Sequence, residues 1–511
     1  MLKVLSVQQV YAAEKRAIMS GLSGMQLMEN AGQLIFEEIA RRYPEGRIIV
    51  LCGPGNNGGD GYVIARLLKA VGREVLVYKI QDQGAIKGDA EQAFEDIHLT
   101  VEDASMLLHG SLDGKHEIRS GDVIVDAVFG VGLNRPLEAE VKDLVEFINS
   151  TGAQIVSVDL PSGSNGDATF IPKTSVRADV TVTFSALKAA HVLFPFAEQC
   201  GEVVVGEIGL SKFFGDNLPK VFVNSPEVWG EALCWPDGLS HKHSRGRLGI
   251  VAGPKSATGA ARLSAIAGAR TGAGHTTLLG RSDVMQELAA HCASVMTKPY
   301  ESVEELINLT DRMNAIVVGP GLGLTEVNRL EILSLLKRRS PIVLDADAIS
   351  LFADGPGELV SHLHSKCVLT PHQQEFERLY PGLFKSADNK IEAALQAARM
   401  SNAVVVLKGA DTVIASPDGL VSVNVHASPF LATAGSGDVL SGIIAGWLAQ
   451  GLKPFDAACA AVWIHGDASL LGGAGLIAED LAEYLPQVLT KLYDRFSSRK
   501  IRWERKFHYR S

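Results

Sequence analysis

Strand-like and helix-like segments alternate along both halves of the chain, and this alternation restricts the fold more than any other feature of the sequence. In the first half, an apolar run at 47–52 is followed by a glycine-rich loop, a helical pattern over 62–70 and a second apolar run at 74–80. A strand, a helix and a strand in this order form a unit whose strands are parallel. Further strands are predicted at 122–129, 154–160, 178–184 and 203–208. We therefore predict an α/β fold built on a parallel sheet.

A second alternating series follows a proline-containing segment at 211–246 that interrupts the pattern. Its predicted strands lie at 248–252, 275–279, 315–318, 342–345, 367–369 and 404–407, and are followed by a hairpin around 417–419 and by helices from 438 to about 496. A chain of 511 residues exceeds what one hydrophobic core usually serves. We predict two α/β domains, at 1–218 and 225–500, with a boundary near residue 220.

The composition excludes several classes of protein. A net charge of −10 argues against nucleic acid as a partner, although the segment 499–510 is locally basic. The sequence contains no run of about 18 apolar residues, so no membrane span is expected. The cysteines are scattered without a C-x-x-C pair, which is typical of buried free thiols in a reducing compartment. We expect a cytoplasmic protein.

Polar loops follow several strands of the first half. The stretch GPGNNGGDG, at 53–61, joins a predicted strand to a predicted helix, where doubly wound folds bind phosphates. Asp126 and Asp159 lie at the ends of two further strands. An aspartate at a strand end is often only a helix cap, and glycines often only form a turn. Because ligands bind beyond the carboxyl ends of parallel strands, however, these three loops are expected to converge on one site.

These motifs resemble the YjeF N-terminal domain, the NAD(P)H-hydrate epimerase family. The resemblance is carried by Asn56–Gly61, by Asp126 with Gly130–Leu133 and by Val158–Gly163. It implies that Asp159 is the acid/base of the epimerisation and also contacts the hydrated dinucleotide. The other substrate-binding residues that it implies are Asn56, Asn57, Gly58, Gly59, Asp60, Gly130, Val131, Gly132, Leu133, Asn134, Arg135 and Pro136. It further implies that Asn57, Asp126 and Ser162 bind a potassium ion, for which their oxygen atoms are suitable ligands.

The sequence does not decide the roles of two residues in the segment SALKAAHVLFP. Lys188 and His191 are explained equally well by a role at the site, by capping or by an ordinary core contact.

In the second half, the stretch ATAGSGDVLSG at 432–442 has glycines and an acid where a helix is about to begin. A helix N-terminus with flanking glycines suits a bound anion, and the carboxylate of Asp438 beside such an anion is electrostatically unfavourable unless it acts, for instance as a base. The alternative is a helix cap behind a glycine-rich turn.

Further signals stand in a recognisable order: the small-residue helix at Gly259–Ala260, VVGPGLG, LDADA, LTPHQQEF and VVLKGADT. Each is weak alone. His372 is explained equally well as an ordinary loop histidine. Lys408 could be an exposed strand end, and Asp345 and Asp347 could be helix caps without a role in binding.

Together these segments resemble the ADP-dependent NAD(P)H-hydrate dehydratases over about residues 225–500. The resemblance implies that Asp438 is the catalytic base, that ADP is the co-substrate with Mg²⁺, and that the hydrate is bound by Ala260, Gly323, His372 and Asp438. The nucleotide is then held by Lys408, Gly409, Ala410, Asp411, Thr412 and Gly437. The two resemblances imply a Rossmann-like three-layer N-terminal domain and a ribokinase-like three-layer C-terminal domain. Hydrated NADH or NADPH is the expected substrate, and a homo-oligomer the expected assembly.

The sequence departs from the dehydratase pattern before the glycine-rich turn. His426–Leu431 stands where the family usually carries a Gly-Asn and a Gly-Met pair, and His243 replaces a usual glycine. Two other functions stay open: a small-molecule kinase that releases its phosphate ester, and an N-terminal half that serves as a non-catalytic, RNA-associated scaffold.

Overall fold

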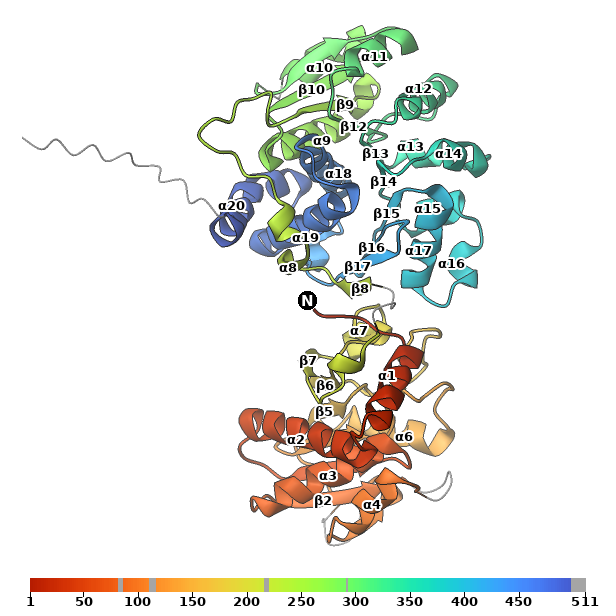
Figure 1. Cartoon of the computed structure of the whole chain (residues 1–511), viewed down its shortest axis with the longest axis vertical. Coiled ribbons are helices and arrows are strands. Elements are labelled where there is room, and N and C mark those ends of the chain that lie inside the picture. The colour runs from red at the N-terminus through yellow and green to blue at the C-terminus, as the bar shows by residue number, and fades with distance from the viewer. Residues whose placement is uncertain (81–85, 110–115, 216–219, 291–292, 498–511) are drawn as a thin grey trace, which may run out of the picture. The chain divides into compact units, whose positions relative to one another are not determined.

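A computed structural model describes residues 1–80, 86–109, 116–215, 220–290 and 293–497 (Figure 1). Contacts between residues divide the chain into two compact units, which comprise residues 2–219 and 220–511. Within the described ranges, no helix is long and apolar enough to cross a membrane. The cysteine at 292 and the basic segment at 499–510 lie outside the described residues.

Among the described residues of the first unit, one seven-stranded sheet has the order β3-β2-β1-β4-β5-β6-β7. All its neighbouring strands are parallel. The strands are β1 (Ile48–Cys52), β2 (Val75–Lys79), β3 (Val101–Asp103), β4 (Val123–Ala127), β5 (Gln154–Val158), β6 (Val180–Phe184) and β7 (Glu202–Gly206). The chain runs outward from β1 and then returns to continue on its other side at β4. This reversal, typical of Rossmann-like sheets, brings the ends of β1 and β4 together.

The helices of this unit are α1 (Val7–Met19), α2 (Gly24–Arg42), α3 (Asn56–Ala70), α4 (Asp89–Glu95), α5 (Ser105–His109), α6 (Ala139–Ile148) and α7 (Phe196–Gln199). Ser6 caps α1 through a reciprocal capping box with Gln9, as the sequence indicates. Successive residues of β1 lie in different apolar clusters. Val50 packs in the cluster that contains residues of α2 and α3, and Leu51 packs in the cluster that contains residues of α6. Apolar clusters therefore cover both faces of the sheet, and the sheet with the helices on its two faces forms three layers.

The second unit contains, among its described residues, a ten-stranded sheet of order β11-β10-β9-β12-β13-β14-β15-β16-β17-β8. Its strands are β8 (Lys220–Val223), β9 (Arg247–Val251), β10 (His275–Gly280), β11 (Met296–Pro299), β12 (Ala315–Val318), β13 (Ile342–Leu344), β14 (Cys367–Leu369), β15 (Val404–Leu407), β16 (Thr412–Ala415) and β17 (Leu420–Asn424). The strands from β11 to β15 are parallel, and the predicted hairpin is the antiparallel pair β16 and β17. The chain again reverses direction, here between β9 and β12.

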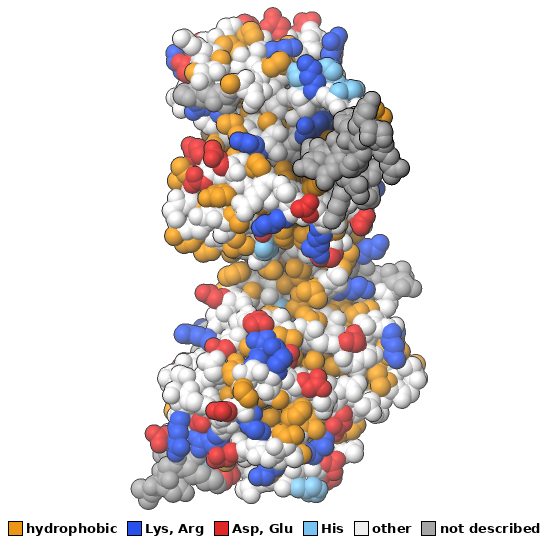
Figure 2. Space-filling view, turned by 90° about the vertical axis from the view of Figure 1, so that its left-hand side faces the viewer, with side chains coloured by type: hydrophobic (Ala, Val, Ile, Leu, Met, Phe, Trp, Pro, Cys, Tyr) orange, Lys and Arg blue, Asp and Glu red, His pale blue; other side chains and the backbone are white. Residues whose placement is uncertain are grey.

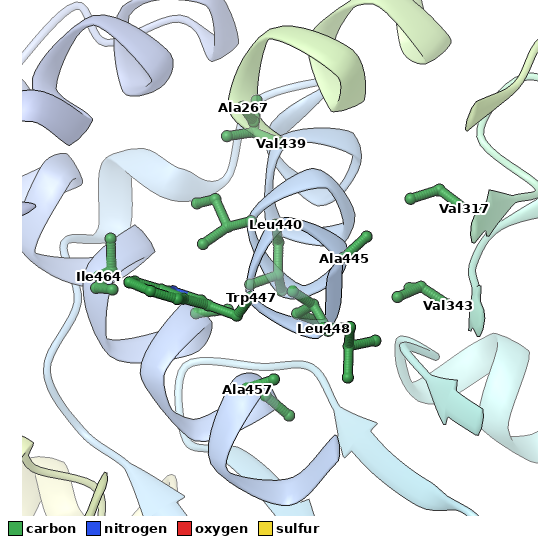
Figure 3. Close-up of a cluster of buried hydrophobic side chains, with 14 of the residues drawn as sticks. Ala267, Val317, Val343, Val439, Leu440, Ala445, Trp447, Leu448, Ala457 and Ile464 are labelled. Carbon is green, nitrogen blue, oxygen red and sulfur yellow. The ribbon is translucent and has the colours of Figure 1, made fainter. Parts of the chain in front are cut away.

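Small and apolar residues build the core that supports this sheet. Trp447 and Leu448 of α18 lie in one buried cluster with Val317 of β12 and Val343 of β13 (Figure 3). The helices of the unit are α8 (Pro226–Trp229), α9 (Thr258–Thr271), α10 (Met285–Ala290), α11 (Val303–Thr310), α12 (Glu326–Lys337), α13 (Asp347–Ser350), α14 (Pro356–His362), α15 (Gln373–Leu379), α16 (Leu383–Ser386), α17 (Lys390–Ser401), α18 (Ser436–Ala449), α19 (Pro454–Gly472) and α20 (Ala478–Phe496). Close packing of α18 on α9 requires small residues, because a Cβ at Gly442 would lie 2.2 Å from the backbone oxygen of Ser264.

Three features differ from the sequence-based expectations. The stretch predicted as a loop at 53–61 is helical from Asn56 onward, because its glycines permit close packing of the helix on the sheet. Strand β8 begins at Lys220, before the predicted domain start at 225, and pairs with β17. Cys234 is exposed rather than buried.

Basic and acidic side chains are interspersed on the face drawn in Figure 2, without a separate basic surface.

Candidate functional site

A cavity of about 520 Å³ lies at the carboxyl edge of the first sheet. The start of α3 contributes Asn56, Asn57 and Asp60, the segment after β4 contributes 130–136, and Asp159 follows β5. The predicted loops therefore converge, as the parallel topology requires.

Two predicted substrate-binding residues do not line this cavity. A Cβ at Gly58 would lie 1.9 Å from the backbone oxygen of Gly53, and one at Gly59 would lie 2.5 Å from Cε of Met28. Both glycines serve the close approach of α3 to its neighbours. Their positions fix the orientation of the first helical turn, and so of Asn57 and Asp60.

Asp159 occupies a constrained position directly after β5. Its backbone has a φ of 63°, in the left-handed region that non-glycine residues rarely adopt, and its side chain is buried. Lys188 Nζ donates to its Oδ1 over 2.6 Å, and Thr183 Oγ1 donates to the same oxygen over 2.8 Å. The backbone oxygen of Asp159 is 2.8 Å from Nε2 of His191. These contacts assign Lys188 and His191, which the sequence leaves open, to the surroundings of Asp159.

The charges around Asp159 keep it ionised. Burial by itself would raise the pKa of this carboxyl, but the ammonium group of Lys188 holds it below its usual range. Burial, followed by the charge of Lys188, lowers the pKa of His191 to about 4, so its imidazole is neutral. Since both anchoring donors use Oδ1, the other carboxylate oxygen is available to a ligand.

Gly130 brings the amide of Asn57 close to this second oxygen. A Cβ at Gly130 would lie 2.8 Å from Oδ1 of Asn57 and 3.4 Å from Oδ2 of Asp159. Nδ2 of Asn57 is buried and has no hydrogen-bond partner within the described part of the chain. The backbone of Gly130 therefore approaches both side chains in a way that a larger residue would prevent.

Asp126 and Ser162 lie beneath the cavity and do not line it. Ser162 donates to Oδ1 of Asp126 over 2.5 Å, and its hydroxyl is 3.3 Å from the backbone oxygen of Phe129. Burial raises the pKa of Asp126, although hydrogen bonds from Ser162 and Ser157 oppose the rise. Carboxylate, hydroxyl and carbonyl oxygens thus gather within a few ångströms, which is the donor set that a hard monovalent cation prefers.

In the second unit, Asp438 stands in the first turn of α18. Gly435 precedes this helix with a φ of 88°, a left-handed conformation that favours glycine. The first N–H groups of a helix have no partner inside it and carry partial positive charge. The glycine-rich turn therefore presents donors beside a carboxylate, as the sequence predicts.

A buried ion pair lies next to this helix start. Lys408 Nζ is 2.9 Å from Oδ1 of Asp345, and Ser441 donates to Oδ2 of Asp345 over 2.7 Å. A Cβ at Gly437 would lie 3.4 Å from Nζ of Lys408, so a glycine here leaves that ammonium accessible. Burial, followed by the charge of Asp345, raises the pKa of Asp438 to about 6, although Lys408 opposes the rise. Asp438 is thus set near neutrality, where a general base is most effective.

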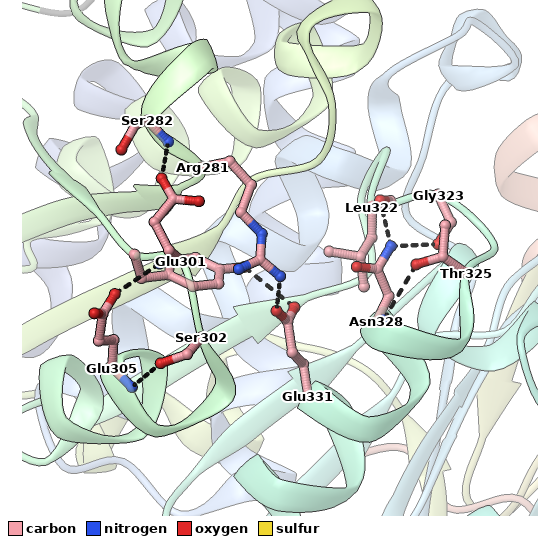
Figure 4. Close-up of polar contacts among 11 residues, drawn as sticks. Arg281, Ser282, Glu301, Ser302, Glu305, Leu322, Gly323, Thr325, Asn328 and Glu331 are labelled. Carbon is pink, nitrogen blue, oxygen red and sulfur yellow. Dashed lines mark hydrogen bonds and ion pairs between the residues drawn. The ribbon is translucent and has the colours of Figure 1, made fainter.

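The turn that carries Gly323 is held by the side chains of Asn328 and Asp347, and the contacts of Asn328 are drawn in Figure 4. Asn328 Nδ2 donates to the backbone oxygens of Leu322 and Gly323, each over 2.9 Å. Asp347 Oδ2 accepts from the N–H of Gly323 over 2.8 Å. Asp347 therefore positions this turn and is not only a cap.

The remaining predicted residues of this unit lie at neighbouring strand ends. His372 is the N-cap of α15, since its Nδ1 accepts from the N–H groups of Gln374 and Glu375, and its ring is exposed. Asp411 forms an ion pair with Lys390 over 2.5 Å. Thr412 closes the turn after β15 by donating to the backbone oxygen of Gly409 over 2.8 Å. Ala260 lies in the first turn of α9, 3.2 Å from the position of a Cβ at Gly321.

The segment that departs from the family pattern is anchored on α19. The ring of His426 stacks on Trp463, with centroids 4.7 Å apart, and its Nε2 is 3.0 Å from Oδ1 of Asp467. The N–H of Ser428 donates to Ser469 over 3.1 Å. This segment therefore keeps a fixed path into the glycine-rich turn without the usual glycines.

Comparisons with known proteins cover both units. The family model of NAD(P)H-hydrate dehydratases matches residues 248–491, and that of the YjeF-related protein N-terminus matches residues 24–190. A bifunctional NAD(P)H-hydrate repair enzyme from Thermofilum pendens is 34% identical over 97% of this chain and 98% of its own length. This chain belongs to the family of bifunctional NAD(P)H-hydrate repair enzymes. The member from Escherichia coli is also 34% identical, over 94% of this chain and 93% of its own length. An ADP/ATP-dependent NAD(P)H-hydrate dehydratase from Bacillus subtilis, solved with ATP and Mg²⁺, is 29% identical over 54% of this chain and 100% of its own, with a TM-score of 0.47.

The comparisons confirm the predicted family and the assignment as a bifunctional enzyme with an epimerase domain and a dehydratase domain that repairs hydrated NAD(P)H. The two helix-covered sheets confirm the α/β fold class. Sequence reasoning did not identify Glu14 and Tyr11 at the epimerase cavity, nor Lys390 beside Asp411. One signal was present for Glu14. It follows Val10 by four residues and precedes Ala17 by three, which places a carboxylate on the buried side of α1.

Proposed function

We propose that the first unit interconverts the R and S forms of hydrated NADH or NADPH, and that the second unit dehydrates the S form at the expense of ADP, giving AMP and phosphate. The observation that carries this proposal is the placement of Asp438 at the start of α18, beside Lys408. A base poised near neutrality next to donors for an anion suits phosphoryl transfer to an alcohol.

In the dehydratase unit, Asp438 takes the proton of the C6 hydroxyl as that oxygen attacks the terminal phosphorus of ADP. The bond to the bridging oxygen breaks, AMP leaves, and the hydrate becomes a phosphate ester. The ring-nitrogen lone pair then expels phosphate, and loss of the C5 proton restores the dihydronicotinamide. Gly437 and its neighbours donate N–H groups to the transferring phosphoryl group, and Lys408 balances its charge.

In this proposal, Ala260, Gly323 and His372 face the hydrate, and the turn from Lys408 to Thr412 contacts the nucleotide. The hydrogen bonds that fix Gly323 and the turn after β15 support rigid positioning of both ligands.

In the epimerase unit, Asp159 is the proposed acid/base. Its free oxygen lies beside Gly130 and Asn57, where the hydrated ring is proposed to bind. Ionisation at neutral pH lets Asp159 accept a proton from the substrate or from water.

Two cations belong to the proposal. Asn57, Asp126 and Ser162 would hold K⁺, and the gathered oxygens beneath the cavity fit such an ion. Bound K⁺ supplies positive charge near the substrate. Mg²⁺ is proposed to enter with the nucleotide, since this ion commonly binds phosphates and only one or two carboxylates.

A cytoplasmic location and a homo-oligomeric assembly complete the proposal. The buried free thiols of Cys52, Cys200, Cys367 and Cys459 suit a reducing compartment.

The decisive experiment supplies purified protein with ADP, Mg²⁺ and a mixture of NADH hydrates. Recovery of the absorbance band of reduced nicotinamide, with one AMP and one phosphate per molecule restored, is the expected result. A stable phosphorylated product without this recovery would support the small-molecule kinase instead. Full use of the mixture requires the epimerase, because the S form alone is dehydrated.

A further inference from the structure

Glu14 projects into the epimerase cavity from a helix that belongs to none of the predicted motifs. Helix α1 buries Val10, Ala13 and Ala17, and Glu14 lines the same cavity as Asp159. Within the described part of the chain, no hydrogen bond fixes its carboxyl. Asp159, by contrast, is anchored by Lys188 and Thr183 through a single oxygen.

The charged and titratable groups around Glu14 come from several elements. Burial is the main reason that the pKa of Glu14 is raised, and the negative charge of Asp159 adds to it, whereas Lys188 opposes it. The groups that share this environment are Tyr11 on α1, Asp60 on α3, Asp159 after β5, and Lys188 and His191 after β6. Four acidic side chains, those of Glu14, Asp60, Glu138 and Asp159, line this cavity. Asp159 is held ionised, whereas burial raises the pKa of Glu14 and of Asp60 and so favours their protonated forms. Such a division is typical of an acid and a base that work together.

We infer that Glu14 is the second proton-transferring residue of the epimerase, acting on the leaving C6 hydroxyl from its own side of the hydrated ring while Asp159 serves water on the other. This inference rests on the epimerase activity proposed above.

The reaction that follows is balanced. Glu14 gives its proton to the C6 hydroxyl, the carbon–oxygen bond breaks, and water leaves as the ring-nitrogen lone pair forms a C6–N double bond. A second water then adds to C6 from the opposite face and gives a proton to Asp159, while the electrons of the double bond return to nitrogen. The proton moves from Asp159 to Glu14 through solvent. In the reverse direction the two carboxyls exchange roles, as microscopic reversibility requires.

The test compares Glu14→Gln with wild type in the rate of R and S interconversion, after subtraction of the uncatalysed rate. Loss of a general acid lowers kcat about 100-fold or more and leaves KM within about threefold. The wild-type rate is expected to fall as pH rises through the pKa of Glu14, because the acid form is lost. This falling limb should be absent in Glu14→Gln and present, at a lower rate, in Glu14→Asp.

Glu37→Gln is the matched control, since Glu37 is exposed on α2. It should match wild type in rate and pH profile. Thermal unfolding of each variant shows whether α1 still packs, and Glu14→Asp, which keeps the carboxyl, provides the test if the glutamine variant does not fold.

The outcomes separate the two proposals. Wild-type protein that does not interconvert the hydrates overturns the epimerase function itself. If wild type is active and folded Glu14→Gln keeps its kcat or changes only KM, the role of Glu14 is overturned. Loss of the falling limb in Glu14→Asp also overturns it.

Discussion

The two proposed catalytic aspartates, Asp159 directly after β5 and Asp438 in the first turn of α18, have pKa values that their surroundings shift in opposite directions. Asp159 receives a direct ion pair from Lys188, which lowers its pKa. Asp438 lies near Lys408, but that lysine pairs with Asp345, and the pKa of Asp438 rises to about 6. The comparison shows that a neighbouring lysine lowers the pKa of a catalytic aspartate below its usual value when it pairs directly with that aspartate. A lysine that pairs with another carboxylate only opposes the rise in pKa.

This difference matches the proposed tasks. A base that removes a proton from an alcohol is more effective when its pKa approaches the working pH, which holds for Asp438. An ionised Asp159 needs a separate proton donor, and Glu14 has the environment of one. Each unit also serves as an internal control for substitutions in the other.

The largest effect is expected for Asp438→Asn. The amide keeps the shape of the turn but cannot accept the proton, so dehydration should fall by roughly 100- to 10,000-fold. Nucleotide affinity measured by calorimetry should stay close to that of wild type, and interconversion of the hydrates in the first unit should be unchanged. Dehydration at the wild-type rate would remove Asp438 from the mechanism.

A smaller but still large effect is expected for Asp159→Ala. Interconversion should fall about 100-fold or more, because the group that exchanges protons with the substrate is lost. Dehydration of pure S hydrate by the same preparation should keep its wild-type rate, which also shows that the variant is folded. Interconversion that persists unchanged would contradict the epimerase role of Asp159.

The pH dependence sharpens the comparison further. Asp438 acts as an anion, so dehydration should rise with pH up to about 6 and fall about tenfold per pH unit below it. The rate of interconversion should instead fall as pH rises, since the protonated form of Glu14 is lost. Initial rates of both reactions in one buffer series measure this difference. Parallel profiles would contradict the assignment of a protonated carboxyl as the limiting group of interconversion.

The smallest effect is expected for Asn328→Ala, which removes the side chain that holds the Gly323 turn. Loss of these hydrogen bonds should cost about 1–2 kcal/mol of stability. The KM for the S hydrate should rise about threefold, because the turn is less well positioned. Thr325→Ala is the matched control. It removes the N-cap hydrogen bond to the backbone N–H of Asn328 but keeps the side-chain hydrogen bonds from Asn328 to the turn, so it should lower stability by about 1 kcal/mol and leave KM unchanged.

Much of the fold could be predicted from the sequence. Strands β12, β14 and β15 lie at the predicted residues, because short apolar runs bounded by turn residues have few alternatives in an alternating α/β chain. The short edge strands β3 and β11 were not predicted. The residues of β3 are only partly buried and those of β11 are mostly exposed, and both sequences lack the continuous apolar run of a central strand.

The candidate sites were predictable only where a motif marked them. Gly58 and Gly59 match the motif, but they contact the residues against which α3 packs and do not line the cavity. Lys188 could not be distinguished from an ordinary core residue, because its partner Asp159 is 29 residues away along the chain. Contacts over such separations depend on how the strands are ordered, which local pattern does not specify.

The sequence by itself determined the α/β class, the two units and the loops in which the carboxylates stand, because periodicity and turn residues act locally. Only the tertiary structure decided which lysine pairs with which aspartate and that Glu14 faces the cavity from α1. Those contacts join segments far apart in the chain, and the acidity of a carboxyl depends on burial and neighbouring charge, which exist only once the chain has folded.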